Sequence, residues 1–170
     1  MSGPVLETER LVLRPPKPQD FESYLGFITS DRAQYVGRVQ TRLAAWKAFA
    51  VEAGHWSLHG YGPWVVTLKS TDRSLGQVGV WHPEGFPERE LGWLIWAEAE
   101  GKGLAYEAAM AARDHDYRVY GTKTLVSYIE PDNARSIRLA ERMGAVLDPA
   151  AEKADEIDFV YRHPGPEGAR

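Results

Sequence analysis

Two glycines stand where a strong helix is about to begin. The stretch Gly101-Lys102-Gly103 is followed at once by the alanine-rich segment LAYEAAMAA. Alanine is the best helix former, whereas a glycine weakens a helix by about 1 kcal/mol relative to alanine. A chain that accepts this loss needs a backbone without Cβ atoms at that point, and this need constrains the fold more than any other feature of the sequence.

The segments around these glycines predict a strand, a helix and a second strand. Residues 89–96 (RELGWLIW) and 122–130 (TKTLVSYIE) have the composition of strands, and the helix between them is expected to end near Val119. Such a unit crosses over right-handed and makes its two strands parallel. Ligands of open α/β sheets bind beside the first turn of the helix, where unpaired N–H groups favour anions. Gly101 and Gly103 are therefore predicted to let an anion approach the backbone, and a tight turn without a ligand is the alternative.

The remaining segments predict a single mixed α/β domain over residues 1–170. Strands are expected at residues 10–16, 63–69, 74–81 and 157–164. Further helices are expected over residues 18–30, 41–58 and 134–143, the last with Asp132 or Asn133 as its N-cap and Gly144 as its stop. Short connections between residues 63 and 96 favour an antiparallel arrangement of the three strands in that region.

Composition excludes several classes of protein. The chain has 170 residues, a formal net charge of −4 and no cysteine. Disulfides, thiolate zinc sites and a cysteine nucleophile are thereby excluded. The negative charge and the lack of a clustered basic stripe argue against a nucleic-acid partner. No apolar run approaches the roughly 18 residues of a membrane span, and no secretory signal is visible, so we expect a cytoplasmic protein without a membrane partner.

The sequence around Gly101 and Gly103 can be compared with the motifs of known anion-binding loops. The dinucleotide fingerprint G-x-G-x-x-G fails because Tyr106 stands at its third glycine. The Walker loop fails because its lysine needs a following Ser or Thr. The pattern that fits is Gly-x-Gly-x-Ala followed by Asn-x-x-Ser on the next strand–helix pair, at Gly101, Gly103, Ala105, Asn133 and Ser136.

This combination resembles the GNAT superfamily of acyl-CoA-dependent N-acetyltransferases, and within it the bacterial group related to ribosomal-protein N-terminal acetyltransferases (the RimJ/RimL type). The resemblance covers nearly the whole chain, through LETERLVLRP, SLGQVGVW, ELGWLIW, GKGLAYEA, PDNARSIRLAERMGA and YRHP in that order. It implies a GNAT-like α/β (α+β) domain whose mixed, mostly antiparallel, twisted sheet has about six to seven strands. About four helices would flank the sheet, and the strands at residues 89–96 and 122–130 would be parallel neighbours.

The activity that the resemblance implies is transfer of an acetyl group from acetyl-CoA to a primary amine by direct attack. The acceptor would be a small molecule or a peptide or protein N-terminus, acetyl-CoA would be the co-substrate, and no metal would take part. The protein would be a monomer or a homodimer. Two other functions stay open, since sites and not folds decide function: a non-catalytic acyl-CoA-binding or sensor domain, and a partner-binding module that has lost the cofactor.

The resemblance also assigns roles to residues. Glu90 matches the position of a general base, and Ser136 that of a hydroxyl that donates to the departing thiolate. Asn133 matches a residue that hydrogen-bonds the pantetheine arm, and a backbone N–H near Leu94 or Ile95 would bind the oxyanion. The full set of cofactor residues is Leu94, Ile95, Trp96, Glu100, Gly101, Lys102, Gly103, Leu104, Ala105, Asn133 and Ser136.

Other readings of the acidic residues are open. Glu90 is also consistent with an ion pair to Arg89 at the strand edge, in which case Glu84, Glu88 or His82 would be the base. Where family loops often begin with Gln or Arg, this chain has Glu98, with Glu100 close by. Two carboxylates beside a pyrophosphate are unfavourable unless they point away, so this pair is expected either to weaken cofactor binding or to face elsewhere.

Histidine and aromatic residues between positions 55 and 64 bear on the acceptor side. His55 and His59 have the i, i+4 spacing that can hold a metal on a helix, but no third ligand is evident, and a surface or groove-lining pair is the favoured reading. His59, Tyr61 and Trp64 are predicted to border the acceptor groove. The polar segment from residue 147 to 156 predicts that the last strands are short.

Overall fold

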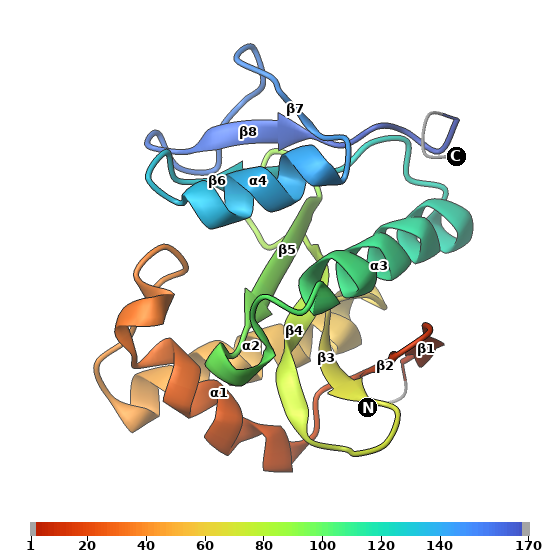
Figure 1. The fold of residues 1–170 in the computed structure, drawn as a ribbon. Coiled ribbons are helices and arrows are strands. Elements are labelled where there is room, and N and C mark those ends of the chain that lie inside the picture. Colours follow the sequence, from red (N-terminus) through yellow and green to blue (C-terminus); the bar gives the residue numbers. More distant parts are fainter. Residues whose placement is uncertain (1–2, 168–170) are drawn as a thin grey trace.

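An eight-stranded mixed sheet runs through the computed structural model, which describes residues 3–167 (Figure 1). The strand order is β1-β2-β3-β4-β5-β6-β8-β7, and β5 and β6 are the parallel neighbours in an otherwise antiparallel sheet. The strands are β1 (Leu6–Glu7), β2 (Leu11–Arg14), β3 (Pro63–Leu68), β4 (Ser74–Trp81), β5 (Glu90–Ile95), β6 (Val126–Ile129), β7 (Val146–Leu147) and β8 (Phe159–Arg162). The outermost residues of the predicted domain, 1–2 and 168–170, lie outside the described range.

Four helices flank the sheet, as predicted. They are α1 (Phe21–Ile28), α2 (Arg42–His59), α3 (Leu104–Tyr120) and α4 (Ala134–Arg142). Thr41 caps α2 by accepting the N–H of Ala44 at 3.2 Å, and Asn133, not Asp132, is the N-cap of α4. No helix between residues 3 and 167 is long and apolar enough to cross a membrane.

The number of strands differs from the prediction of six to seven. All six predicted strands form, and the additional two are β1 and β7, which have two residues each. A two-residue strand is too short to display an alternating pattern, so neither could be recognised in the sequence. The strands after residue 145 are short, as the polar segment predicts.

Small residues bring α3 close to the sheet. Ala108, Ala109 and Ala112 have no exposed surface and belong to the same buried cluster as Val78 of β4 and Leu91 of β5. An alanine-rich face allows a helix to lie near a strand without leaving a void. The helix that follows the two glycines is therefore fixed to the centre of the sheet, and its first turn is held beside the end of β5.

Strands β5 and β6 pair at one position and then diverge. Glu90 is in register with Val126, and the Val126 N–H donates to the Arg89 carbonyl at 3.1 Å. Beyond this point the two strands separate, and Figure 1 shows β5 running away from β6 and α4. The predicted parallel pair is confirmed, and its divergence opens the sheet on the side where α3 and α4 begin.

A buried glycine in β4 gives a test of this packing. A Cβ at Gly79 would lie 2.5 Å from the Gly62 carbonyl oxygen and 2.7 Å from the Pro63 Cα, both backbone atoms. We expect Gly79→Ala to lower the free energy of unfolding by about 2 kcal/mol or more because the backbone must shift. Gly54→Ala is the matched control, since open space surrounds this residue of α2, and it should stabilise the protein by about 1 kcal/mol. Urea unfolding measures both, and a Gly79→Ala variant as stable as the parent would contradict the packing.

Candidate active site

The first turn of α3 presents a backbone cradle. Gly101 and Gly103 have φ angles of 70° and 74°, a region that other residues rarely adopt, and they turn the chain sharply from β5 into the helix. A Cβ at Gly101 would meet nothing within 4 Å, so the glycine is needed for its conformation and not for space. No side chain caps α3, whose N-cap is Gly103. The first N–H groups of this 17-residue helix are thus left to an external acceptor.

A groove of about 1030 Å³ passes over this cradle and is lined by basic side chains. Its arginines are Arg32, Arg135, Arg138 and Arg142. Such a combination of guanidinium groups and free helix N–H groups suits a phosphate-bearing ligand.

The two carboxylates near the cradle are neutralised by arginines. Glu98 accepts from Arg73 at 2.8 Å, and Glu100 accepts from Arg135 at 2.7 Å and also from Arg32. Burial raises the pKa of Glu100, but the hydrogen bonds and charges of Arg32 and Arg135 outweigh it and hold that pKa below its ordinary value. Neither carboxylate therefore adds an unpaired negative charge to the groove, which removes the electrostatic objection raised by the sequence.

Most of the predicted cofactor residues line this groove. They are Leu94, Ile95, Glu100, Gly101, Gly103, Leu104, Ala105, Asn133 and Ser136. The two others lie elsewhere. Trp96 is only 5% exposed and donates its Nε1–H to the Ser74 hydroxyl, and the Lys102 ammonium donates to the Glu98 carbonyl at 2.7 Å. Trp96 thus belongs to the core, and Lys102 closes the turn before the cradle.

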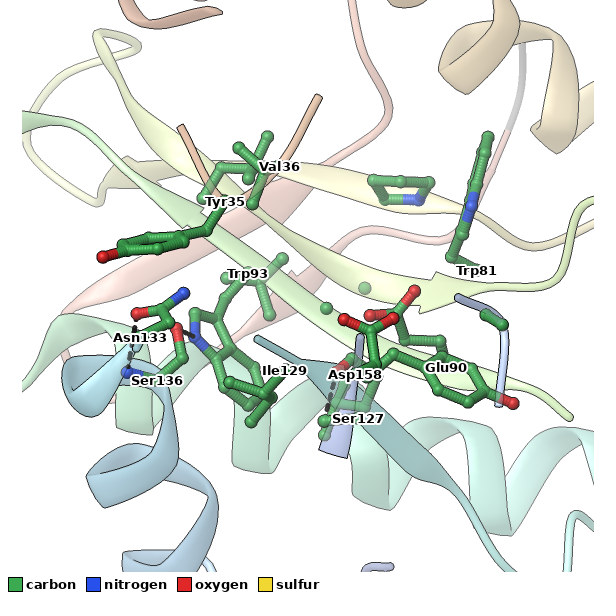
Figure 2. Close-up of a pocket in the computed structure, with 18 of the residues that line it drawn as sticks. Tyr35, Val36, Trp81, Glu90, Trp93, Ser127, Ile129, Asn133, Ser136 and Asp158 are labelled. Carbon is green, nitrogen blue, oxygen red and sulfur yellow. Dashed lines mark hydrogen bonds between the residues drawn. The ribbon is translucent and has the colours of Figure 1, made fainter. Parts of the chain in front are cut away.

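Asn133, Ser136 and Trp93 meet at the opening between β5 and β6. The Asn133 side-chain oxygen accepts the Ser136 N–H at 3.3 Å, which caps α4 and leaves the Asn133 amide NH₂ to the groove. The Ser136 hydroxyl oxygen accepts from the Trp93 indole N–H at 3.1 Å. Because the indole is a donor only, the hydroxyl proton of Ser136 stays available for an acceptor in the groove. Figure 2 shows the three side chains grouped at one end of a second cavity.

The divergence of the strands frees backbone N–H groups of β5. The Arg89 carbonyl, just before β5, accepts the backbone N–H of Val126, and the Leu91 carbonyl accepts the side-chain hydroxyl of Ser127. The odd-numbered residues of β5 thus direct their backbone polar groups toward β6. On the other side, the Trp96 N–H donates to Leu75 of β4. By this alternation the N–H of Ile95 faces the opening, whereas that of Leu94 faces β4.

The second cavity, of about 430 Å³, adjoins the groove and shares Trp93, Asn133 and Ser136 with it. Its floor is the face of β4 and β5 toward α2. Gly79 and Gly92 form a register pair there, which leaves a hollow without side chains. The pair Trp81 and Glu90 lies at one end of this hollow, and the pair Gln77 and Leu94 lies at the other end. We call this cavity the acceptor pocket.

Glu90 extends over the floor of the acceptor pocket. Its carboxyl carbon lies 3.9 Å from where a Cβ of Gly92 would be, so the side chain leans along β5 toward Leu94. Burial raises the pKa of Glu90 to about 8, against a lowering hydrogen bond from the Tyr128 backbone and with a smaller raising effect from the charge of Asp158. Figure 2 shows Glu90 and Asp158 close together, at the end of the pocket away from Ser136. A carboxyl with such a pKa can exchange a proton near neutral pH.

The structure also bears on the alternative roles considered for Glu90 and its acidic neighbours. Arg89 does not pair with Glu90 but with Asp116, at 2.9 Å. Glu88 forms an ion pair with Arg162 at 2.8 Å, and its hydrogen bonds from that guanidinium lower its pKa. The lining of the acceptor pocket contains Glu90 but not the three alternative bases Glu84, Glu88 and His82.

The expectation that His59, Tyr61 and Trp64 border the acceptor groove is wrong. Trp64 is 1% exposed and Tyr61 is 4% exposed, both in the core, and none of the three lines the acceptor pocket. Tyr61 and Trp64 belong to the main buried cluster, and His59 packs against His55 and Tyr61. The sequence of the short loop after α2 does not indicate this burial.

The His55 and His59 pair also has a structural explanation. Their rings stack with centroids 4.3 Å apart, and His55 Nδ1 lies 2.7 Å from the Tyr61 carbonyl oxygen. His55 Nε2 accepts the His82 backbone N–H at 3.2 Å. Both nitrogens of His55 are thus used inside the protein, and residues 3–167 contain no cluster of three His, Cys, Asp or Glu side chains able to hold a metal.

Sequence reasoning missed two residues of the site. The first is Trp93, whose only signal in the sequence is the alternation in ELGWLIW, which places it on the opposite face from Glu90 and Leu94. The second is Glu52 of α2, which lines the acceptor pocket. Its signal is a lone carboxylate in the otherwise uncharged segment AFAVEAGHWSL, which an amphipathic helix also explains.

Comparisons with known proteins agree with this geometry. A domain family described as Acetyltransferase (GNAT) domain matches residues 10–146. The uncharacterized protein YkkB of Bacillus subtilis (strain 168) is 30% identical over 166 residues, which cover 92% of this chain and 93% of that protein.

Solved structures extend the comparison. An acetyltransferase from Agrobacterium tumefaciens str. C58 has a TM-score of 0.90 at 42% identity and covers 96% of this chain and 95% of its own. The fold is shared with RimL, a ribosomal L7/L12 alpha-N-protein acetyltransferase in complex with coenzyme A, at a TM-score of 0.76, 16% identity and coverage of 98% and 100%. With a family match over most of its length, the chain belongs to the GNAT acetyltransferase family.

Proposed function

We propose that this protein transfers an acetyl group from acetyl-CoA to a primary amine by direct attack. The observation that carries the proposal is the junction of two cavities of opposite character. A groove with arginines and a backbone cradle meets a pocket with carboxylates, and Trp93, Asn133 and Ser136 belong to both. A transfer reaction needs this arrangement, because donor and acceptor must meet at one place.

The residues of the groove fit acetyl-CoA. The N–H groups from about Glu100 to Ala105 would bind its pyrophosphate at the first turn of α3, with the arginines of the groove nearby. The amide of Asn133 would hold the pantetheine arm in the opening between β5 and β6. When bound, the group supplies a thioester carbonyl carbon that an amine can attack.

Three groups of this chain would then act on the reacting atoms. Glu90 would take a proton from the bound ammonium, directly or through a water, over the floor at Gly92, and the neutral amine would then attack the thioester carbon. The N–H of Ile95, which faces the opening, would donate to the oxygen that becomes an oxyanion. The Ser136 hydroxyl would donate to the sulfur as the C–S bond breaks, while its oxygen accepts from Trp93.

Removal of the base gives the first test. We expect Glu90→Gln to lower kcat/KM for amine acetylation by about 10²–10⁴-fold, since general acid–base catalysis contributes that much. In the parent protein kcat/KM should rise with pH through about 8, as Glu90 loses its proton, and the variant should lose this part of the profile. Release of free thiol from acetyl-CoA measures the rate with a panel of amines.

A second variant tests the role of the Ser136 hydroxyl. Ser136→Ala should lower kcat/KM by less than about tenfold, since a neutral hydrogen bond is worth about 1 kcal/mol. Coenzyme A binding is the control for both variants. Both variants should bind coenzyme A as the parent does. Full activity of Glu90→Gln at neutral pH would contradict the role of Glu90. A parent protein that binds coenzyme A but acetylates no amine would replace the enzyme with a sensor, and one that binds no coenzyme A would leave a partner-binding module.

The raised pKa of Glu90 also affects stability. The folded protein keeps this proton up to about pH 8, whereas the unfolded chain loses it near pH 4.5, so the stabilising contribution is full below 4.5 and is lost as the pH rises through 8. Glu90→Gln stays neutral and should therefore gain stability over the parent at about pH 9 but not at about pH 4. Urea unfolding at both pH values measures this, with the exposed Glu152→Gln as control. A stability difference between Glu90→Gln and the parent that does not change with pH would contradict the burial of this charge.

A further inference from the structure

The acceptor pocket carries more negative charge than its chemistry requires. Five carboxylates line it: Glu52, Glu90, Glu130, Asp155 and Asp158. The described lining contains no lysine, arginine or histidine. Catalysis of amine attack needs one base, so four of these carboxylates have no role in the proposed reaction.

These carboxylates also lack salt bridges within the described part of the protein. The one cation there that acts on them is Lys153, whose charge partly offsets the burial that raises the pKa of Asp158. None of the five forms a salt bridge with a side chain of residues 3–167. Just outside the pocket the pattern is different, since Arg162 pairs with both Glu88, at 2.8 Å, and Asp148, at 2.7 Å. The five carboxylates of the pocket thus carry no salt bridge within residues 3–167, whereas the neighbouring Glu88 and Asp148 are paired.

Glu52 of α2 and Gln77 of β4 form the wall of the pocket where a bound cation has the most evident partners. The Glu52 carboxyl accepts from the Tyr24 hydroxyl through Oε1 at 2.9 Å, while its Oε2 is buried without a hydrogen-bond partner. Gln77 lies on the pocket floor, is only 2% exposed, and its side-chain oxygen Oε1 also has no partner. Buried polar atoms without partners are costly, and Glu52 and Gln77 both line the acceptor pocket, so their two acceptors point to a donor from a ligand.

We propose that the acceptor is a diamine or polyamine, whose reacting nitrogen lies over Gly92 beside Glu90 and whose second ammonium is held by Glu52 and Gln77. This inference rests on the proposed acetyl transfer and names the substrate class of that site. An ammonium has three N–H donors and no acceptor, which matches two unpartnered oxygens. A hydroxyl group has one donor and leaves one oxygen unsatisfied. Burial raises the pKa of Glu52 to about 7, although hydrogen bonds from Tyr24 and Gln77 lower it, so at about pH 8 this carboxyl is mostly ionised and a second ammonium neutralises it.

Three probes of similar length separate the possibilities. These are 1,4-diaminobutane, 4-amino-1-butanol and 1-aminobutane, which end in an ammonium, a hydroxyl and a methyl group. Their rates of acetylation are compared at about pH 8 in the parent and in Glu52→Gln, which can still accept from Tyr24. Glu152→Gln, exposed and outside the pocket, is the matched control for removal of one charge.

The expected result is a selective loss. The parent should prefer the diamine over both monoamines by about tenfold or more in kcat/KM, because hydrogen bonds to charged groups are worth at least that factor. Glu52→Gln should remove most of this preference by raising KM for the diamine, and it should change the rates of the monoamines by less than about twofold. Glu52→Asp, which keeps the charge but shortens the side chain, should retain part of the preference. Glu152→Gln should behave as the parent.

Other results overturn the inference. Equal rates for the diamine and the amino alcohol would mean that the wall binds a neutral donor. A drop in kcat for all three amines in Glu52→Gln would make Glu52 part of the proton transfer and not a specificity residue.

Failure of the reaction itself is a separate outcome, and thermal unfolding with 1,4-diaminobutane distinguishes it. If no amine is acetylated but the diamine stabilises the parent and not Glu52→Gln, the proposed function fails and the diamine site stands. If the diamine neither reacts nor stabilises the parent, the inference fails as well.

Discussion

The divergence of β5 and β6 after a single residue pair is the constraint on which the rest of the site depends. A closed sheet would pair the backbone groups of Trp93 and Ile95 with β6. Here the strands part after Glu90 and Val126, and the Trp93 side chain enters the opening and donates to Ser136. The same opening lets the groove beside α3 and α4 communicate with the pocket beneath α2. Without it the two cavities would lie on opposite sides of a continuous sheet.

Charge is divided between the two cavities. Arginines line the groove beside the α3 cradle, whereas among residues 3–167 the acceptor pocket is lined by carboxylates and by no basic side chain. The net charge of −4 does not reveal this division, because it sums the charges of the whole chain, including the arginines of the groove and the carboxylates of the pocket. Phosphate and ammonium are thus directed to different ends of one passage. The groove lining also includes Asp31, which pairs with Arg38, Glu100, which pairs with Arg32 and Arg135, and Asp132, so the four arginines outnumber its carboxylates.

The sequence predicted the fold class and all strands but β1 and β7, and it singled out the glycine turn and the helix cap because these follow local rules. Gly101 and Gly103 could be recognised since their positive φ angles are a local requirement, and Asn133 since capping is local too. The bond between Trp93 and Ser136 joins residues 43 positions apart, and no spacing rule indicates it.

Which side chains are buried was the second property that the sequence could not predict. Tyr61 and Trp64 were misplaced because an aromatic residue after a helix fits a core as well as a groove. The role inferred for Glu52 depends on the buried, unpartnered Oε atoms of Glu52 and Gln77, two residues that line the pocket, and only the packing of the folded chain reveals them. Glu90 stood out in the sequence by its position, whereas its raised pKa results from burial in the folded protein.

A crystal structure of the protein with acetyl-CoA tests the central claim most directly. The account predicts the pyrophosphate on the N–H groups at the first turn of α3, the pantetheine arm in the opening between β5 and β6, and the sulfur within about 3.5 Å of the Ser136 hydroxyl oxygen. The acetyl carbonyl should point toward the Ile95 N–H, with its carbon facing the acceptor pocket. A pantetheine arm that avoids the opening, or a thioester that lies away from Ser136 and Glu90, would contradict the account.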